Sequence, residues 1–222
     1  MLPVLLLSLP APAQYVYHSQ LGAQSLGLPQ FGTPAGVAVD AQGNLYVSDN
    51  ARHVVHKISP DGKVLLTIGS PGAEDGQLDK PAGIALDGQG NLLVADAGND
   101  RIQKFSATGQ FLAVIGTAGS GDGQFYSPTG VAVDAQGNLY VADGQNHRVQ
   151  KLSGTGTFLA KFGGFGTENG RFATPVHVAL DGRGNLYVSD LYNHRVQKFT
   201  IAGVFVSALG QYGSANGELS DP

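Results

Sequence analysis

The chain has 222 residues, of which 33 are glycine, 14% are charged and none is cysteine. Without cysteine there can be no disulfide framework, thiol nucleophile or cysteine-ligated zinc module. The 13 basic and 17 acidic residues give a net charge of −4, whereas a nucleic-acid footprint normally needs a basic face. We therefore expect a folded chain, 42% apolar, that binds no nucleic acid.

The first predicted element is a leader at residues 1–13. Residues 2–9 form a short apolar run, and Ala11-Pro12-Ala13 has the small-x-small pattern of a cleavage site. No lysine or arginine precedes the run, so a plain hydrophobic tail is the alternative. We interpret the segment as a signal peptide, which predicts a secreted or periplasmic protein. The run is too short to span a bilayer, and no later stretch is long enough to do so.

A repeat of 47 residues fills the rest of the chain. The same step separates the prolines that open each unit, and it also separates four aspartates and four asparagines within the units. The units are residues 34–80, 81–127, 128–174 and 175–221. Such a fixed period is the signature of a repeat architecture.

Each unit predicts four short strands. In the first unit, an alternating segment at 36–40 is followed by a Gly/Asn turn and then by β-branched and aromatic runs at 45–49, 54–59 and 64–68. No long window shows a helical period. Four antiparallel strands in about 40–50 residues are typical of a propeller blade. The sequence predicts an all-β chain with a β-propeller of four complete blades.

The segments DGQNHRVQK at 143–151 and DLYNHRVQK at 190–198, with the preceding Gly-Asn-Leu-Tyr-Val runs, resemble the NHL repeat. The resemblance covers residues 34–217. Two copies depart from it: the first reads Arg52-His53-Val54, and the second has Asp100 in place of the histidine. The resemblance implies a propeller, most often a six-bladed one.

Residues 15–22 align with 62–69, the fourth strand of the first unit. Propellers that resemble this family often close their ring by pairing such an N-terminal strand with the last blade. We expect residues 14–222 to form four blades plus this outer strand of a closing blade, as in a truncated six-bladed propeller. The alternative is a chain that associates with another copy through its open blade edges.

The up-and-down order of the strands predicts two different faces. Turns between strands one and two, and between three and four, share one face, whereas the Asn-His-Arg loops and the glycine-rich connectors share the other. Function usually lies on long, variable loops, and exposed aromatic and arginine side chains supply binding hot spots. We predict ligand contacts on the long-loop face from Tyr126, His147, Arg148, Phe165, Tyr192, His194, Arg195 and Tyr212. The alternative for the arginines is a structural role with the strand-two aspartates.

His177 occupies the position that is Gly36, Gly83 and Gly130 in the other units, near the channel mouth. A histidine there can be a ligand or a general base, or merely a tolerated polar side chain. The loop histidines share one register on different blades, and sheets pack about 10 Å apart, so one metal ion cannot join them. We expect no metal and no cofactor.

These patterns favour a non-enzymatic binding scaffold that presents its long-loop face to a protein or a glycan. The alternative is a propeller enzyme of the lyase or lactonase type, with its active site at the channel mouth. Propeller lyases similar to this chain use histidines directly after the proline that opens a blade. The corresponding residues here are Ala35, Ala82, Thr129 and Val176.

Overall fold

The computed structural model describes residues 30–220 and residue 222. The predicted leader at 1–13 and the predicted strand at 15–22 lie outside the described residues. Four blades follow one another along the chain. Their strands are β1 (Pro34–Val39), β2 (Leu45–Asp49), β3 (Val54–Ile58) and β4 (Val64–Ile68); β5 (Pro81–Leu86), β6 (Leu92–Asp96), β7 (Arg101–Phe105) and β8 (Phe111–Ile115); β11 (Pro128–Val133), β12 (Leu139–Asp143), β13 (Arg148–Leu152) and β14 (Phe158–Gly163); and β15 (Pro175–Leu180), β16 (Asn185–Asp190), β17 (Arg195–Thr200) and β18 (Phe205–Leu209).

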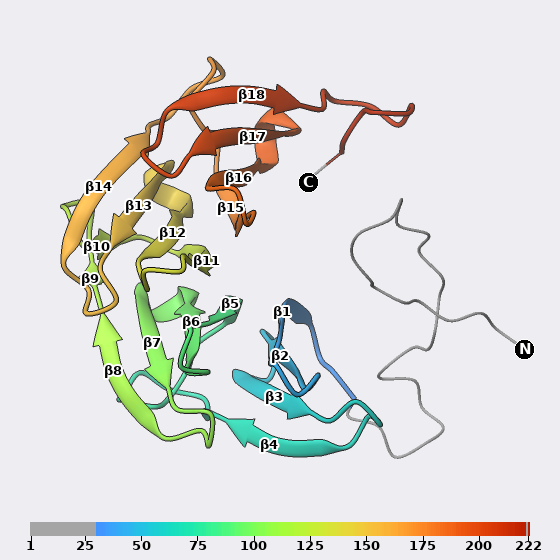
Figure 1. Ribbon diagram of the computed structural model, residues 1–222, viewed down its shortest axis with the longest axis vertical. Helices are drawn as coiled ribbons and strands as arrows, with labels where there is room; N and C mark the ends of the chain where they lie inside the picture. Colours follow the sequence, from blue (N-terminus) through green and yellow to red (C-terminus); the bar gives the residue numbers. More distant parts are fainter. Residues whose placement is uncertain (1–29, 221) are drawn as a thin grey trace, which may run out of the picture.

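Each blade is an antiparallel sheet in which the strands follow chain order. The first strands of successive blades, β1, β5, β11 and β15, contact one another and line the inner side. The fourth strands form the outer rim, and the blades together make an open arc (Figure 1). The predicted all-β propeller with four blades is confirmed. The helical segments of the described residues are single 3-10 turns, none long or apolar enough to cross a bilayer.

Aspartates begin the turns between the first two strands of each blade. In the first blade, Asp40 Oδ1 accepts hydrogen bonds from the backbone N–H groups of Gln42 (3.0 Å) and Asn44 (2.9 Å). Its other oxygen, Oδ2, accepts one from Asn44 Nδ2 (2.9 Å). Gly43 has a φ of 80°, which a side chain would strain. This local chemistry explains why Asp-x-x-Gly-Asn recurs in every unit.

The hydrophobic core lies between blades. Side chains of the first blade, such as Tyr46 and Ile68, pack on Ile84, Leu92 and other residues of the second blade. Similar clusters join the second blade to the third and the third to the fourth. Because each blade buries its apolar side chains against its neighbours, the stack of blades fixes the position of the loops on the two faces of the arc.

The two faces of the arc have different loops. The short-turn face consists of the turns 40–44, 87–91, 134–138 and 181–184, together with 59–63, 106–110, 153–157 and 201–204. The long-loop face consists of the loops 50–53, 97–100, 144–147 and 191–194 and of the connectors 69–80, 116–127, 164–174 and 210–220. A hydrogen bond from Asn146 Nδ2 to the carbonyl of Gly119 (2.9 Å) links a loop to a connector, which places both on one face.

Candidate functional site

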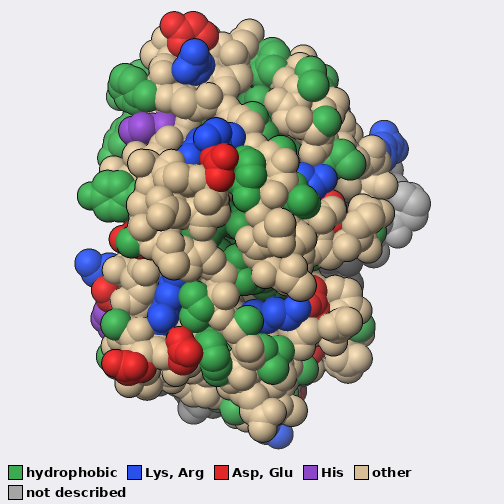
Figure 2. Space-filling view, turned by 90° about the vertical axis from the view of Figure 1, so that its left-hand side faces the viewer, with side chains coloured by type: hydrophobic (Ala, Val, Ile, Leu, Met, Phe, Trp, Pro, Cys, Tyr) green, Lys and Arg blue, Asp and Glu red, His purple; other side chains and the backbone are tan. Residues whose placement is uncertain are grey.

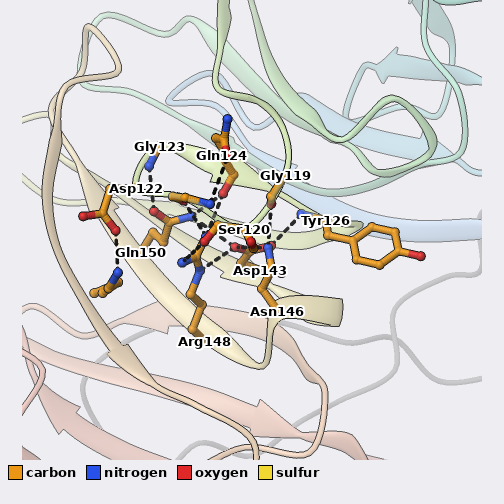
Figure 3. Close-up of polar contacts among 12 residues, drawn as sticks. Gly119, Ser120, Asp122, Gly123, Gln124, Tyr126, Asp143, Asn146, Arg148 and Gln150 are labelled. Carbon is orange, nitrogen blue, oxygen red and sulfur yellow. Dashed lines mark hydrogen bonds and ion pairs between the residues drawn. The ribbon is translucent and has the colours of Figure 1, made fainter.

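A fully buried aspartate at the end of the second strand organises the long-loop face of each blade. In the third blade, Asp143 Oδ2 accepts hydrogen bonds from Arg148 Nε (2.8 Å) and Asn146 Nδ2 (2.9 Å). Its Oδ1 accepts the backbone N–H of Tyr126 (2.8 Å), which belongs to the preceding connector. Figure 3 shows these groups converging on the carboxylate, with the Tyr126 ring pointing away from them. The aspartate therefore joins a loop, a strand and a connector.

Arg148 extends the same network into the connector. Its terminal nitrogens donate to the carbonyls of Ser120 (2.8 Å) and Gly121 (2.8 Å), and also to Gln124 (2.9 Å). Gln150 is buried beside it and accepts the N–H of Gly123 (2.9 Å). These bonds to a carboxylate and three carbonyls use four of the five N–H donors of the buried guanidinium. Arg148 consequently holds the connector in place from below.

The second and fourth blades repeat this arrangement. The Asp96 carboxylate accepts a hydrogen bond from Arg101 Nε (2.8 Å), and the Asp190 carboxylate accepts one from Arg195 Nε (2.9 Å). The Arg195 terminal nitrogens also donate to connector carbonyls, those of Thr167, Glu168 and Arg171. The first blade differs because its arginine, Arg52, lies in the loop and is half exposed.

The histidine register joins a loop of the long-loop face to the end of the following connector. His147 Nδ1 accepts the backbone N–H of Thr174 (3.2 Å), and His53 Nδ1 accepts that of Lys80 (3.0 Å). In the second blade Asp100 Oδ1 does the same for Ser127 (2.7 Å). These acceptors have left-handed backbone conformations, with φ between 54° and 57°. Aspartate replaces histidine because the position needs an acceptor that tolerates this conformation.

Above this network, four aromatic side chains are exposed. Tyr126, Phe165, Tyr192 and Tyr212 are between 56% and 73% accessible to solvent. The Phe165 and His147 rings pack edge-on with their centroids 5.0 Å apart, and the centroids of the Tyr212 and His194 rings are 4.7 Å apart. The backbones of Phe165 and Tyr212 also form β-bridges with the connector residues Phe172 and Leu219. The rings are thus exposed on a fixed backbone.

The predicted ligand contacts therefore lie at two depths. The four aromatic side chains are exposed, and His147 and His194 lie half-buried beside two of them. Arg148 and Arg195 are buried below. A contact between these arginines and a ligand stays a prediction. Their bonds to the aspartates and connectors agree with the alternative, a structural role.

His177 lies apart from the long-loop aromatics, on the exposed innermost strand β15. With Gly36, Gly83, Gly130 and apolar neighbours, it lines a cavity of about 210 Å³ at the channel mouth. A Cβ on Gly130 would lie 2.6 Å from the Val176 carbonyl oxygen, and one on Gly83 would lie 2.7 Å from Gly130 Cα. Glycine is required wherever the next inner strand crosses this closely. Among the described residues no strand crosses β15 in this way, so the histidine fits.

The carboxylates of the short-turn face are held in the ionised form. Hydrogen bonds from the Asn185 side chain and backbone lower the pKa of Asp181 to about 2. Burial by itself raises the pKa of Asp87, but hydrogen bonds from Lys104 and Asn91 outweigh burial, and the pKa is lowered. Within residues 30–220, no group of three or more histidine, aspartate or glutamate side chains is arranged to hold a metal ion.

Three cavities lie on the short-turn face, between successive blades. Their volumes are about 520 Å³ between the first two blades and about 440 Å³ at each of the next two junctions. Sequence reasoning did not find these grooves. They depend on side chains from two blades, such as Leu93 and Gly154, that are far apart in the sequence. The replacement of tyrosine by Leu93 in one unit is the signal that could have indicated one of them.

The four-stranded blade occurs four times, and the Asp-Asn-Arg-Gln network recurs in the second, third and fourth blades, an arrangement that defines an NHL-type propeller. The NHL repeat profile matches residues 31–58, 78–105, 125–152 and 172–199, which together make up half of the chain. The chain belongs to the NHL repeat family.

The chain is similar in sequence to a Drosophila protein and in fold to two lyase structures. Protein brain tumor of Drosophila melanogaster is 33% identical over 63 residues, which are 28% of this chain and 6% of that protein. A streptogramin B lyase structure matches 82% of this chain and 55% of its own, with a TM-score of 0.61 and 16% identity. A catalytically inactive virginiamycin B lyase from Staphylococcus aureus with quinupristin matches 83% of this chain and 58% of its own, at a TM-score of 0.61 and 14% identity.

At these identities the two structures show a shared fold and nothing about activity. The chain spans little more than half the length of either solved relative and a small part of the Drosophila protein.

Proposed function

We propose that the chain is a non-enzymatic binding module that presents its long-loop face to a protein. The observation that carries this proposal is the set of exposed aromatic side chains on connectors and loops whose polar groups are bonded below the surface. Tyrosine, phenylalanine and arginine are enriched in interfaces, and a few aromatic residues commonly provide most of the binding energy.

Rigidity supports the same proposal. The connectors that bear Phe165 and Tyr212 are fixed by β-bridges, and Arg148 and Arg195 hold connector carbonyls from inside. A surface that is ordered before binding loses less conformational entropy when a partner docks. The two arginines therefore support the contact residues in this proposal, while the rings meet the partner. A glycan is the second candidate ligand, because aromatic rings also stack on sugar rings.

Export is part of the proposal and rests on residues 1–13. An exported scaffold would be secreted or periplasmic and would meet its partner outside the cytoplasm. N-terminal sequencing of the mature protein tests this point, with cleavage near Ala13 as the expected result. An uncleaved N-terminus in the exporting host would contradict it.

Self-association is a further proposed interaction, through the outer faces of the first and fourth blades. Val37 is 65% exposed, whereas its equivalent Ile84, covered by the first blade, is 7% exposed; Leu209 on the fourth blade is 65% exposed. A blade of a second copy could cover such a surface. If its inner strand packed on β15 as closely as β11 packs on β5, the His177 Cβ would clash with that strand. His177→Gly should therefore strengthen association in sedimentation experiments. An unchanged monomer would contradict this proposal.

The enzymatic alternative has one observation in its favour, the exposed His177 at the channel-mouth cavity. The other residues that line this cavity are alanine, glycine, valine and isoleucine, which supply no second acid or base. General acid–base chemistry usually needs a partner group within hydrogen-bond reach. The long-loop face therefore remains the better-supported site.

A displayed peptide library and a glycan array, both probed with the purified chain, would test the proposal. We expect peptides that bind the wild type and the matched Gln110→Ala/Thr157→Ala variant, whose changes lie at exposed positions of the short-turn face. The Tyr192→Ala/Tyr212→Ala variant should lose them. Binding only on the glycan array would establish the second candidate. Ligands held equally by the wild type and the tyrosine variant would overturn the long-loop assignment.

A further inference from the structure

A tyrosine lies under a lysine in three of the four blades. The Nζ of Lys57 is 4.9 Å from the centre of the Tyr46 ring, and the equivalent distance from Lys151 to Tyr140 is 5.0 Å. In the fourth blade Lys198 lies 5.6 Å from Tyr187. An ammonium within about 6 Å of a ring centre is attracted to the ring face. In each pair the tyrosine and the lysine are directly opposite each other on adjacent antiparallel strands, β2 and β3, β12 and β13, or β16 and β17.

The tyrosine hydroxyl also has a place in this arrangement. The Tyr140 hydroxyl lies 3.3 Å from Asp134 Oδ2, and the Tyr187 hydroxyl lies 3.3 Å from Asp181 Oδ2. These aspartates begin the turns of the short-turn face. The fold therefore contains a recurrent phenol site, with a lysine over the ring and a carboxylate at the hydroxyl.

The second blade keeps the lysine and the aspartate but lacks the ring. Leu93 is paired with Lys104 across β6–β7, in the register where the other blades have tyrosine. Lys104 Nζ contacts Asp87 Oδ2 directly at 2.8 Å. The corresponding pair in the third blade, Lys151 and Asp134, is 3.9 Å apart, with the Tyr140 hydroxyl beside the carboxylate. In the first blade, which has the Tyr46 ring, Lys57 Nζ lies 3.2 Å from Asp40 Oδ2. Of these three pairs, the one in the blade without a ring is the shortest.

The position of the absent ring faces a groove between the second and third blades. Asp87, Leu93 and Lys104 line one side of this cavity of about 440 Å³, and the other side includes Leu139 and Gly154.

At the junction between the third and fourth blades, Ile201 takes the place of Gly154. The Ile201 carbonyl oxygen lies 3.3 Å from the Tyr140 hydroxyl. Neither Tyr140 nor Lys151 lines the cavity at this junction. The three grooves have similar volumes, so the lining distinguishes them. Of the three grooves, the one beside Leu93 is lined by a lysine–aspartate pair and by a leucine in place of the ring; the Lys104 and Asp87 side chains are 20% and 10% exposed.

We propose that this groove binds the side chain of a tyrosine presented by a partner protein. The ring would enter the groove beside the Lys104 ammonium, and the hydroxyl would donate to Asp87. A lysine over a tyrosine ring recurs in the other three blades, and the bond from the hydroxyl to the turn aspartate occurs in the third and fourth. This site lies on the short-turn face and is independent of the proposed long-loop interface.

Titration with N-acetyltyrosinamide, followed by amide chemical shifts of the labelled chain, tests the proposal. We expect saturable shifts confined to Asp87, Lys104, Gly137 and Gly154, and weaker binding of N-acetylphenylalaninamide because it lacks the hydroxyl. Leu93→Tyr fills the site with the chain's own ring and should weaken binding by about tenfold or more. Tyr46→Leu should create a second set of shifts around Asp40 and Lys57.

Lys104→Gln provides a variant that keeps the leucine and removes the charge, should Leu93→Tyr disturb the packing. It should weaken binding of N-acetyltyrosinamide while leaving the spectrum of the remaining blades unchanged. Absence of saturable shifts in the wild type would overturn the proposal. So would equal binding by the wild type, a folded Leu93→Tyr variant and Lys104→Gln.

Discussion

The two faces of the arc are built from the same repeat, yet they differ in which positions vary. On the short-turn face, Asp40, Asp87, Asp134 and Asp181 make the same bonds to their own turns. On the long-loop face the buried network is also repeated, but the exposed side chains differ between blades. Tyr192, for example, corresponds to Gly98 and Gln145.

This difference supports the proposed interface, because the structural groups of the long-loop face lie below its exposed side chains. The long-loop connectors are held by backbone groups and by buried side chains such as Asp143 and Arg148, whereas the aromatic rings above them are exposed. The exposed positions can then change without loss of the blade. On the short-turn face the turn residues are themselves the structural groups.

Among the described residues, the outer rim of the arc has no single charged patch. Figure 2, which views this rim, shows positive and negative side chains interspersed over it.

The largest expected effect comes from removing the centre of the long-loop network. Asp143→Ala would leave the buried Arg148 guanidinium without its carboxylate and the Tyr126 N–H without its acceptor. Breaking a buried ion pair in this way costs about 3–5 kcal/mol of unfolding free energy. Urea denaturation at neutral pH measures it. The exposed Asp122, paired with Lys161, is the matched control, and Asp122→Ala should change stability little. Similar losses in both variants would contradict the account.

A smaller effect is expected at the inner strands. Gly83→Ala would place a Cβ 2.7 Å from Gly130 Cα, where only backbone movement could relieve the contact. Overpacking of this kind costs about 1–3 kcal/mol. His177→Ala, at the same position of the fourth blade, should be nearly neutral in the same denaturation experiment. If Gly83→Ala were equally neutral, the steric reason for the glycines would be wrong.

The histidine register gives a weaker test. His147→Ala removes the acceptor for the Thr174 N–H and should cost about 1 kcal/mol. His147→Asp should cost much less, because Asp100 makes the same bond one blade earlier. Thermal unfolding of both variants distinguishes these outcomes. Equal destabilisation would show that the ring, and not its acceptor nitrogen, matters.

The smallest effect concerns pH on the short-turn face. Because the pKa of Asp181 falls from 3.8 to about 2 on folding, its contribution is present above pH 3.8 and is lost as the pH falls to about 2. Asp181→Asn should show a smaller decline of the urea midpoint over this range than the wild type. Parallel declines would show that Asp181 does not contribute.

Much of this architecture could be predicted from the sequence. The 47-residue step, the Gly-Asn turns and the alternating strands define the blades, and strand parity separates the two faces. Hydrogen-bond roles could not be predicted. The bond from Thr174 to His147 joins residues 27 positions apart, and its requirement for an acceptor becomes clear only when Asp100 makes the same bond.

Burial was the other property that the sequence left open. The sequence allowed Arg148 to be either a ligand contact or a structural partner of the strand-two aspartate; Arg148 is buried and donates to Asp143. His177 is similar: the sequence shows that it replaces a glycine, while only the packing of neighbouring inner strands explains why the others are glycine. The exposed aromatics, by contrast, lie on the face predicted for them.

The central claim is that recognition belongs to the long-loop face. The most direct measurement is the hydrogen-exchange and chemical-shift footprint of a peptide selected for binding, mapped on the whole chain. The account predicts protection and shifts at the loops and connectors around Tyr126, Phe165, Tyr192 and Tyr212, with no change at the turns 40–44 and 181–184. A footprint confined to the short-turn face, with those four residues unaffected, would contradict it.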